Sequence, residues 1–269
     1  VILECVSMFG IKKTLESLEG MFALAIWDKK EKKLTLARDR FGEKPLFYFL
    51  DSEQLVFSSE LKVIKKFFAH QSLKINYKAS KYYSWLGYIP APMTIYENVH
   101  KVLPSEYVEI SYGLIKKKKY WNLLNNYFQV NNDLTKKGLK QNLEEVELVL
   151  ENSVKKMMLA DVEVGCFLSG GIDSSLIASL MQKNSKKKIK TYTVGFSETA
   201  FDESTYAKHI SRYLGTDHNE IIVSINDLIE NINKIIDIYD EPFADSSCLP
   251  TELICKFASR DLKVILSGD

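Results

Sequence analysis

The sequence has few of the residues that cross-link small folds or hold structural metals. Its four cysteines, at positions 5, 166, 248 and 255, show no paired spacing and have no set of histidines nearby. Neither a disulfide framework nor a zinc site is therefore expected, and unpaired cysteines fit a reducing cytoplasm, the location we predict. The sequence also lacks any apolar run approaching the roughly 20 residues of a membrane helix, so no membrane association is expected.

An excess of one charge sign is missing as well. The chain has 36 Lys and Arg against 35 Asp and Glu, a net charge of +1. No broad charged field is available to attract nucleic acid or an anionic membrane, so neither is expected as a partner. With 269 residues, 46% hydrophobic and 26% charged, the composition fits a soluble globular protein of one large domain or two ordinary ones.

The most informative stretch is the Ser-Gly-Gly-Ile-Asp-Ser-Ser loop at 169–175, between the apolar run 162–168 and the helical run 176–183. The two glycines allow the backbone to approach a ligand closely, and a helix N-terminus carries partial positive charge. Ser174 and Ser175 can donate to phosphate oxygens, while Asp173 is a hard oxygen ligand suited to Mg²⁺. The alternative, a tight turn capped by Asp173, needs fewer of these residues.

The loop at 169–175 lacks the Gly-Lys-Ser/Thr of a Walker loop and the three glycines of a dinucleotide fingerprint. It resembles instead the Ser-Gly-Gly-x-Asp-Ser loop of ATP pyrophosphatases, which cleave ATP between the α and β phosphates. Strands expected at 190–196, 220–223 and 262–266 alternate with helices at 206–214, 225–239 and 253–257. This alternation predicts a parallel sheet, with ligands at the carboxyl ends of its strands. Ser169, Gly195 and Ser267 lie at such ends, so one nucleotide can contact all three.

Residues 1–120 show a different pattern. A helical stripe at 1–18 is interrupted near Gly10, and a hairpin follows in which the apolar run 21–27 is expected to be buried on both faces. Further strands and a helix at 61–68 predict the later half of a layered α/β sandwich. The polar stretch 121–138 is the predicted linker, and residues 139–269 form the second predicted domain. Because the chain opens on Val1 and stops after an apolar strand, we expect a fragment truncated at both ends.

A series of motifs runs along nearly the whole chain in one order. They are Gly-Met-Phe-Ala-Leu-Ala-Ile-Trp-Asp at 20–28, Arg-Asp-Arg-Phe-Gly-Glu-Lys-Pro-Leu at 38–46, Gly-Tyr-Ile-Pro-Ala-Pro at 87–92, the loop at 169–175, Phe-Asp-Glu at 201–203, Leu-Gly-Thr-Asp-His at 214–218, Asp-Glu-Pro-Phe-Ala-Asp-Ser-Ser at 240–247 and Ser-Gly-Asp at 267–269. Together they resemble the glutamine-hydrolysing asparagine synthase family. The order of the motifs is far more specific than any one of them.

The resemblance implies a class II glutamine amidotransferase domain at 1–120, of the N-terminal-nucleophile hydrolase type, and an ATP pyrophosphatase domain at 139–269, of the adenine-nucleotide α-hydrolase type. It implies that glutamine supplies ammonia and that MgATP adenylates the side chain of L-aspartate. Ammonia then displaces AMP, leaving asparagine. The glutaminase nucleophile and the second magnesium carboxylate would lie outside this chain, which is therefore not expected to hydrolyse glutamine. The resemblance also allows a homodimer.

Residue by residue, the resemblance assigns a nucleotide site with ATP and Mg²⁺ as cofactors. Leu168 and Val194 would contact the adenosine, Ser169, Gly170, Gly171, Asp173, Ser174 and Ser175 the pyrophosphate, and Gly195, Ser267 and Gly268 the nucleotide again. Asp173 would also hold the metal. Asp269 stands where many members have a glutamate implicated in forming the acyl-adenylate, and is the predicted catalytic residue. Asp240, Asp245 and Ser246 are predicted on the acceptor side.

Two alternatives to asparagine synthesis stay open. The loop at 240–247 departs from the Thr- and Arg-bearing sequence of some confirmed asparagine synthases. An arginine there would pair with the α-carboxylate of the acceptor, so another carboxylate, such as a sugar acid in polysaccharide assembly, is the second interpretation. The third is a nucleotide-binding module without turnover.

Overall fold

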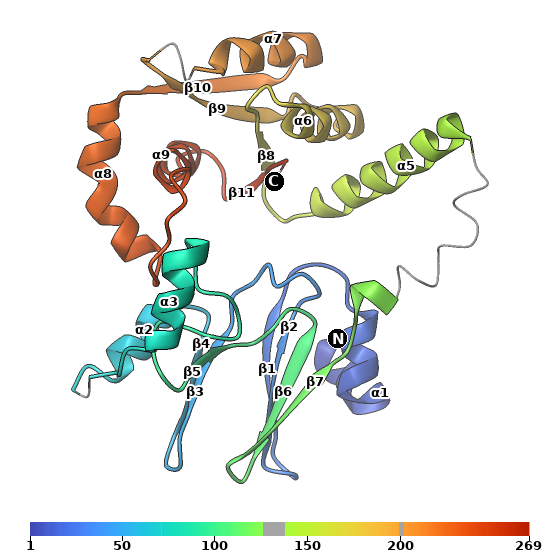
Figure 1. The fold of residues 1–269 in the computed structure, drawn as a ribbon. Coiled ribbons are helices and arrows are strands. Elements are labelled where there is room, and N and C mark those ends of the chain that lie inside the picture. Colours follow the sequence, from blue (N-terminus) through green and yellow to red (C-terminus); the bar gives the residue numbers. More distant parts are fainter. Residues whose placement is uncertain (71, 126–137, 199–201, 269) are drawn as a thin grey trace. The chain divides into compact units, whose positions relative to one another are not determined.

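The computed structural model describes residues 1–70, 72–125, 138–198 and 202–268. The chain forms two compact units: Val1–Asn132 with Ile238–Ala244, and Asp133–Asp237 with Asp245–Asp269. The sequence-based division placed its boundary at the linker alone and did not separate residues 238–244 from their neighbours. Residues 126–137, which make up most of the predicted linker, lie outside the described residues (Figure 1).

The first unit is built on two antiparallel sheets. One sheet has the order β1-β2-β6-β7, with β1 (Ala23–Asp28), β2 (Lys33–Arg38), β6 (Glu106–Ser111) and β7 (Leu114–Lys119). The other has the order β4-β3-β5, with β4 (Leu55–Ser58), β3 (Phe47–Leu50) and β5 (Val99–Lys101). Three helices of this unit are α1 (Ile2–Ser17), α2 (Leu61–Phe67) and α3 (Tyr77–Leu86).

Alternation along the strands explains the layers of the first unit. Leu36 of β2 and Tyr48 of β3 meet in the core between the two sheets. The neighbouring Ala37 points to the opposite face, where it packs with Leu15 of α1, and Phe49 points outward to α2. Because successive side chains of a strand face opposite ways, the order of layers is helix, sheet, sheet, helix (Figure 1). The predicted layered α/β fold is confirmed.

The structure corrects one prediction about this unit. Most of the apolar run 21–27 lies in β1, which among the described strands pairs with β2 alone, at the edge of its sheet, and Trp27 remains 54% exposed. The strand buried on both faces is β2, because it lies between β1 and β6 and is covered by both neighbouring layers. The interruption predicted near Gly10 is confirmed: α1 is kinked there, where the glycine has a φ of 77°.

The second unit is a parallel sheet with helices on both faces. Its strand order is β10-β9-β8-β11, with β8 (Val164–Phe167), β9 (Lys190–Phe196), β10 (Asp217–Val223) and β11 (Val264–Leu266), and every pairing is parallel. The helices are α5 (Leu139–Met157), α6 (Ile172–Asn184), α7 (Ser204–Leu214), α8 (Ile225–Ile238) and α9 (Cys248–Ala258). The predicted parallel sheet is confirmed.

The two faces of this sheet have different partners. Cys166 of β8 packs with Met181 of α6 and Ala207 of α7, whereas Tyr192 of β9 packs with Ile254 of α9. Figure 1 shows these elements around the sheet. All four cysteines are free thiols, and burial raises the pKa of Cys166 to about 12. None of the described helices combines the length and apolar character that a bilayer crossing requires.

Candidate nucleotide site

The candidate site begins where β8 ends. Leu168 still belongs to the ladder, since its N–H donates to the carbonyl of Tyr192 at 2.9 Å. The chain then turns at Gly170, which has a φ of 87°. A Cβ at this position would lie 2.8 Å from the Cβ of Tyr206, so both the backbone conformation and the approach of α7 require glycine.

Serine hydroxyls fix the shape of the loop. The N–H of Ser169 donates to Oγ of Ser174 at 3.2 Å, and the two hydroxyl oxygens are 2.9 Å apart. Oγ of Ser169 accepts the N–H of Gly171 at 3.3 Å, and Oγ of Ser175 donates to the carbonyl of Gly171 at 2.5 Å. The hydroxyls predicted to face phosphate oxygens are thus the groups that hold the loop closed in this structure.

Helix α6 starts at this loop without a side-chain cap. Its N-cap is Gly171, and among the described residues no side chain accepts a hydrogen bond from its first turn. Within the described part of the chain, the N-cap residues of α1, α2, α5, α7 and α9 likewise make no side-chain cap hydrogen bond, whereas Asn76 accepts the N–H of Ala79 at 3.1 Å at the start of α3 and Ser224 bonds Asp227 at the start of α8. The first N–H groups of a helix have no intrahelical acceptor, so the start of α6 offers them to an anion.

The end of β11 closes the other side of this helix start. A Cβ on Gly268 would lie 2.5 Å from the backbone nitrogen of Ser174 and 2.7 Å from the carbonyl carbon of Asp173. Only glycine therefore allows the strand end to approach the first turn of α6 so closely. The Ser-Gly pair at 267–268 and the loop at 169–175 form one continuous backbone surface.

The end of β9 is held in a similar way. A Cβ on Gly195 would lie 2.9 Å from Oδ1 of Asp202. That oxygen accepts the N–H of Ser204 at 3.1 Å and of Phe196 at 3.3 Å. These hydrogen bonds, led by the one from Ser204, lower the pKa of Asp202. Asp202 thereby fixes the start of α7 against the strand end.

Two cavities open beside this backbone surface. The first, of about 330 Å³, is lined by Phe167, Leu168, Ser169, Tyr192, Thr193, Val194, Phe196, Glu203 and Ile254. The second, of about 270 Å³, is lined by Phe167, Ser169, Gly171, Asp173, Ser174, Thr251, Ile254, Ser267 and Gly268. The first is mainly apolar and aromatic and suits a nucleobase, whereas the second is bordered by backbone N–H groups and hydroxyls and suits phosphates.

The structure brings the predicted nucleotide residues together. Leu168 and Val194, predicted at the adenosine, share the first cavity, and Asp173 and Gly268 share the second. Three further predicted residues do not line these cavities but determine the local backbone. Gly170 forms the turn of the loop, Ser175 forms a hydrogen bond within α6, and the absence of a side chain at Gly195 leaves space for the residues at the start of α7.

Sequence reasoning missed several lining residues. Thr251 and Ile254 come from α9, and no local signal marks them, because only the packing of α9 on the sheet brings them to the cavity. Phe167 and Tyr192 were within reach of prediction: they border predicted residues on β8 and β9, and strand alternation places Tyr192 on the same face as Val194.

The charge in the two cavities is negative. The described residues that line them include the acidic residues Asp173 and Glu203 but no lysine or arginine. Among the residues that the structure describes, no group of three or more His, Cys, Asp or Glu could hold a metal ion. The exposed Asp173 therefore fits Mg²⁺ shared with phosphate oxygens, since Mg²⁺ commonly binds through one or two carboxylates plus substrate phosphates.

The remaining predicted residues are divided between the units. Asp269 lies outside the described residues. Asp245 and Ser246 belong to the second unit, and Oδ1 of Asp245 accepts the N–H of Ser247 at 2.9 Å, which lowers the pKa of Asp245. Asp240 belongs to the first unit, where Oδ1 lies 3.7 Å from Nζ of Lys62.

In the charged motif at 38–46 of the first unit, Arg38 and Asp39 bond to the protein backbone, while Nε of Arg40 is buried with no hydrogen-bond partner among the described residues. The carboxylate of Asp39, 1% exposed, accepts the N–H groups of Phe41, Glu43 and Lys44 at 3.2, 2.9 and 2.9 Å. Burial raises the pKa of Asp39, but these backbone donors outweigh it and hold the pKa below its ordinary value. The guanidinium of Arg38 donates to the carbonyls of Lys44 and Val102 at 2.8 and 2.9 Å.

Known proteins resemble both units. Residues 1–121 match the model of the glutamine amidotransferase domain and residues 145–269 that of asparagine synthase. The putative asparagine synthetase (glutamine-hydrolyzing) 2 of Methanocaldococcus jannaschii is 35% identical over 275 residues, covering 100% of this chain and 51% of that protein. Asparagine synthetase (glutamine-hydrolyzing) 1 of Bacillus subtilis is 34% identical, covering 96% and 39%.

The chain spans about half or less of the length of these relatives. Among solved structures, the NH3-dependent NAD synthetase from Campylobacter jejuni has a TM-score of 0.34 at 16% identity, covering 47% of this chain and 56% of that one. The two domain models match in succession and the relatives align along nearly the whole chain. Residues 1–121 therefore resemble glutamine amidotransferase domains, residues 145–269 resemble asparagine synthase, and the chain as a whole is similar to glutamine-hydrolysing asparagine synthetases.

Proposed function

We propose that the second unit binds MgATP at the carboxyl end of its sheet, with the adenosine in the cavity of Leu168 and Val194 and the phosphates in the cavity of Asp173 and Gly268. The observation that carries this proposal is the close approach of Gly268 to the start of α6, where an added Cβ would lie 2.5 Å from the backbone nitrogen of Ser174. A purely structural turn would not need this close approach of a second strand end.

The residues at this site support activation of a carboxylate. An acceptor oxygen attacks the α phosphorus of ATP, the bond to the β phosphate breaks, and pyrophosphate leaves. Backbone N–H groups at the start of α6 would hold the departing negative charge, and Mg²⁺ beside Asp173 would supply further charge neutralisation. Ammonia then attacks the acyl carbon and AMP departs, giving an amide. None of these steps requires a protein nucleophile.

We propose further that the complete enzyme takes its ammonia from glutamine and forms L-asparagine from L-aspartate. The names of the relatives and the amidotransferase match at residues 1–121 support this. One observation favours another carboxylate as the acceptor: the loop at 240–247 contains no arginine to pair with an α-carboxylate.

The test is pyrophosphate release by the full-length gene product with MgATP and ammonium, comparing L-aspartate with no acceptor. Release that requires aspartate and is lost in Asp173→Ala is expected, whereas Asp161→Ala, an exposed aspartate of the same unit, should leave it unchanged. Pyrophosphate release that does not depend on aspartate would indicate that another carboxylate is the acceptor. Nucleotide binding without any release would contradict the enzymatic proposal.

A further inference from the structure

One short segment of the chain leaves the unit that surrounds it in sequence. Ile238–Ala244 belongs to the first unit, whereas the residues on both sides, up to Asp237 and from Asp245, belong to the second. Ordering seven residues on the other unit costs conformational entropy. Specific contacts within the first unit must therefore hold this segment.

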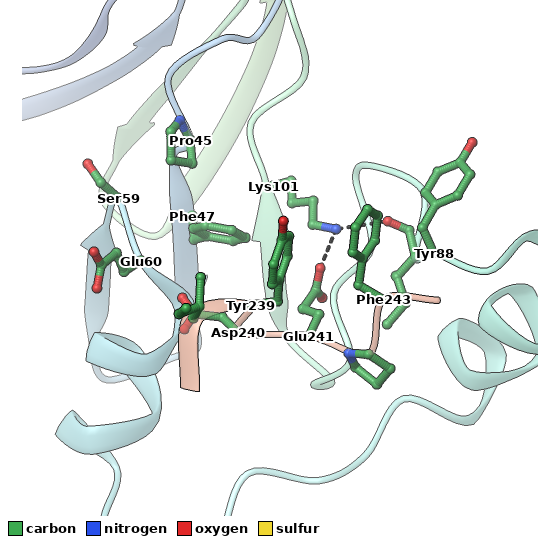
Figure 2. A pocket seen from close by; sticks show the side chains of 13 residues that line it. Pro45, Phe47, Ser59, Glu60, Tyr88, Lys101, Tyr239, Asp240, Glu241 and Phe243 are labelled. Atoms are coloured by element: carbon green, nitrogen blue, oxygen red, sulfur yellow. Dashed lines mark hydrogen bonds and ion pairs between the residues drawn. The ribbon is translucent and has the colours of Figure 1, made fainter. Parts of the chain in front are cut away.

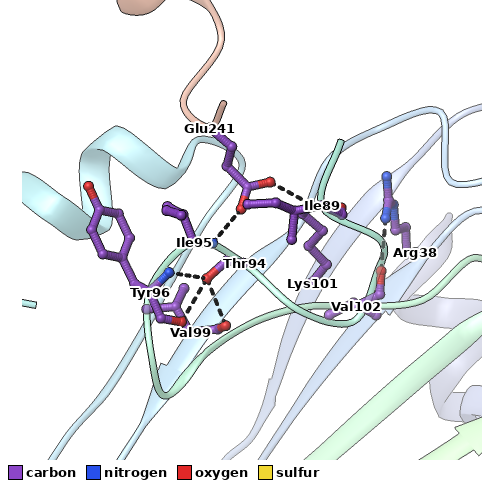
Figure 3. Close-up of polar contacts among 9 residues, drawn as sticks. All are labelled: Arg38, Ile89, Thr94, Ile95, Tyr96, Val99, Lys101, Val102 and Glu241. Carbon is purple, nitrogen blue, oxygen red and sulfur yellow. Dashed lines mark hydrogen bonds and ion pairs between the residues drawn. The ribbon is translucent and has the colours of Figure 1, made fainter. Parts of the chain in front are cut away.

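Glu241 makes the strongest of these contacts (Figure 3). Its side chain is only 14% exposed; Oε2 forms an ion pair with Nζ of Lys101, and Oε1 accepts the backbone N–H of Ile95 at 2.8 Å. Lys101, 16% exposed, donates in turn to the carbonyl of Ile89 at 2.8 Å. Both charged groups therefore have partners that fix their positions.

Other residues of the segment order the segment itself and secure its C-terminal end. The rings of Tyr239 and Phe243 stack, with centroids 4.8 Å apart and planes at 13°. The N–H of Ala244 donates to the carbonyl of Gly87 at 2.8 Å. Tyr239, Glu241 and Phe243 border a cavity of about 460 Å³ whose remaining walls come from the first unit (Figure 2).

The chemical nature of the contact between Glu241 and Lys101 indicates its role. Desolvating two charges offsets much of their attraction, so a well-packed apolar pair would hold the segment equally well. A carboxylate held by Lys101 and by the Ile95 N–H instead favours one register, because a shift that brought Pro242 to this position would leave Lys101 unpaired, and the side chain of Asp240 is one methylene shorter than that of Glu241. The contact at Glu241 therefore specifies position more than it adds stability.

The position of the segment matters for the second unit through the chain itself. Asp245 and Ser246, the predicted acceptor-side residues, follow Ala244 directly. Helix α9 begins at Cys248 and carries Thr251 and Ile254 into the nucleotide cavities. The segment that Glu241 holds on the first unit is therefore joined directly, along the chain, to the predicted acceptor-side residues and to α9.

We propose that Glu241 is a positioning residue: through Lys101 and the Ile95 N–H it anchors Ile238–Ala244 on the first unit and so couples that unit to the acceptor loop and α9. Only the activity part of this inference rests on the proposed function. Glu241 itself is not required to touch substrate or nucleotide.

Amide hydrogen exchange of the full-length gene product tests the anchor directly. In Glu241→Gln, exchange of the amides of residues 239–241, 243 and 244 and of Ile95 should accelerate by about tenfold or more, because local opening becomes easier. Glu109→Gln is the matched control: Glu109 is also 14% exposed in its side chain and paired with a lysine, Lys118, at 2.7 Å in the first unit. Equal exchange in wild type and Glu241→Gln would overturn the proposal.

Kinetics test the coupling. Glu241→Gln should lower glutamine-dependent amide formation by about tenfold relative to ammonium-dependent formation, since dissolved ammonium does not require the first unit. The double variant Glu241→Gln/Lys101→Met, which leaves no unpaired charge, should fold more stably than Glu241→Gln yet keep the altered ratio. An equal loss of both activities would reduce Glu241 to a purely structural role and overturn the coupling. If the wild type shows no acceptor-dependent pyrophosphate release, the proposed function fails while the exchange experiment still decides the anchor.

Discussion

Two loops of this chain arrange backbone N–H groups around a negative charge, one loop in each unit. After β2, the loop closes around its own carboxylate, Asp39, which accepts the N–H groups of Phe41, Glu43 and Lys44. After β8, the loop closes through Ser169 and Ser174 and leaves the start of α6 uncapped among the described residues. The first loop supplies the carboxylate that accepts its N–H groups, whereas under the proposed function the N–H groups of the second loop bind the phosphates of a nucleotide.

This difference shows that a charged motif need not mark a binding site. The motif at 38–46 has five charged residues in nine positions. The side chains of Arg38 and Asp39 nevertheless form their hydrogen bonds with the protein backbone. The loop at 169–175 has one charged residue, Asp173, and offers its backbone instead. A structural loop is therefore distinguished from a candidate binding loop by the polar groups that lack a partner within the protein. The number of charged residues does not distinguish them.

The largest expected effect comes from deleting the internal anion of the first loop. Asp39→Ala removes the buried carboxylate that accepts several backbone N–H groups of its loop and should lower the free energy of unfolding by about 3 kcal/mol, measured by urea unfolding. Asp51→Ala is the matched control, because the exposed Asp51 also accepts two backbone N–H groups, each at 2.8 Å. Formate should partly restore the stability of Asp39→Ala. Equal losses in the two variants would contradict a special role for Asp39.

The second loop should respond in ligand affinity rather than in stability. Gly268→Ala places a Cβ against backbone atoms of α6 that cannot move aside easily, so affinity for MgATP should fall by about 100-fold, as measured by calorimetric titration. Gly138→Ala serves as control, since no atom lies within 4 Å of its added Cβ. Retained affinity in Gly268→Ala would place the nucleotide elsewhere.

Magnesium should account for a smaller share of the affinity. The lining residues described here include no lysine or arginine, so ATP without Mg²⁺ should bind about tenfold more weakly. Asp173→Asn should cause a similar loss. Because both changes remove one interaction, combining them should cost no more than the larger single effect. Additive losses would show that Asp173 acts independently of the metal.

The contribution of Asp39 to stability should depend on pH. The folded-state pKa of Asp39 is lowered, so its contribution to stability is present above the unfolded pKa of about 3.9 and is lost as pH falls through the lower folded value. The stability gap between wild type and Asp39→Asn should therefore narrow below about pH 4, as followed by urea unfolding. A gap that stays constant down to pH 2 would rule out the charge of Asp39 as its source.

The smallest effect is expected from the serine hydroxyls. Ser174→Ala removes the acceptor of the Ser169 N–H and should lower stability by about 1 kcal/mol and weaken MgATP binding several-fold. Ser175→Ala should have less effect on binding, because its hydroxyl bonds only within its own helix turn. A larger loss in Ser175→Ala would mean that its hydroxyl contacts the ligand instead.

Much of the fold and of the loop after β8 could be predicted from the sequence, because these features depend on local patterns of residues. Alternating strands and helices predicted the parallel sheet, and the glycine pair predicted the turn after β8. The edge position of β1 was not accessible, since the apolar run at 21–27 carries no signal for which strands flank it. The anchoring of Glu241 on Lys101 and the approach of Thr251 depend on contacts between residues far apart in the chain.

The most direct test of the contrast between the loops is the response of backbone amides to nucleotide, followed by hydrogen exchange or NMR on the full-length gene product. Saturating MgATP should protect or shift the amides of residues 170–174 and of Gly268, while those of residues 41–44, already bonded to Asp39, stay unchanged. Unchanged amides at 170–174 under saturating nucleotide, or changes confined to the first unit, would contradict the assignment of the second loop as the phosphate site.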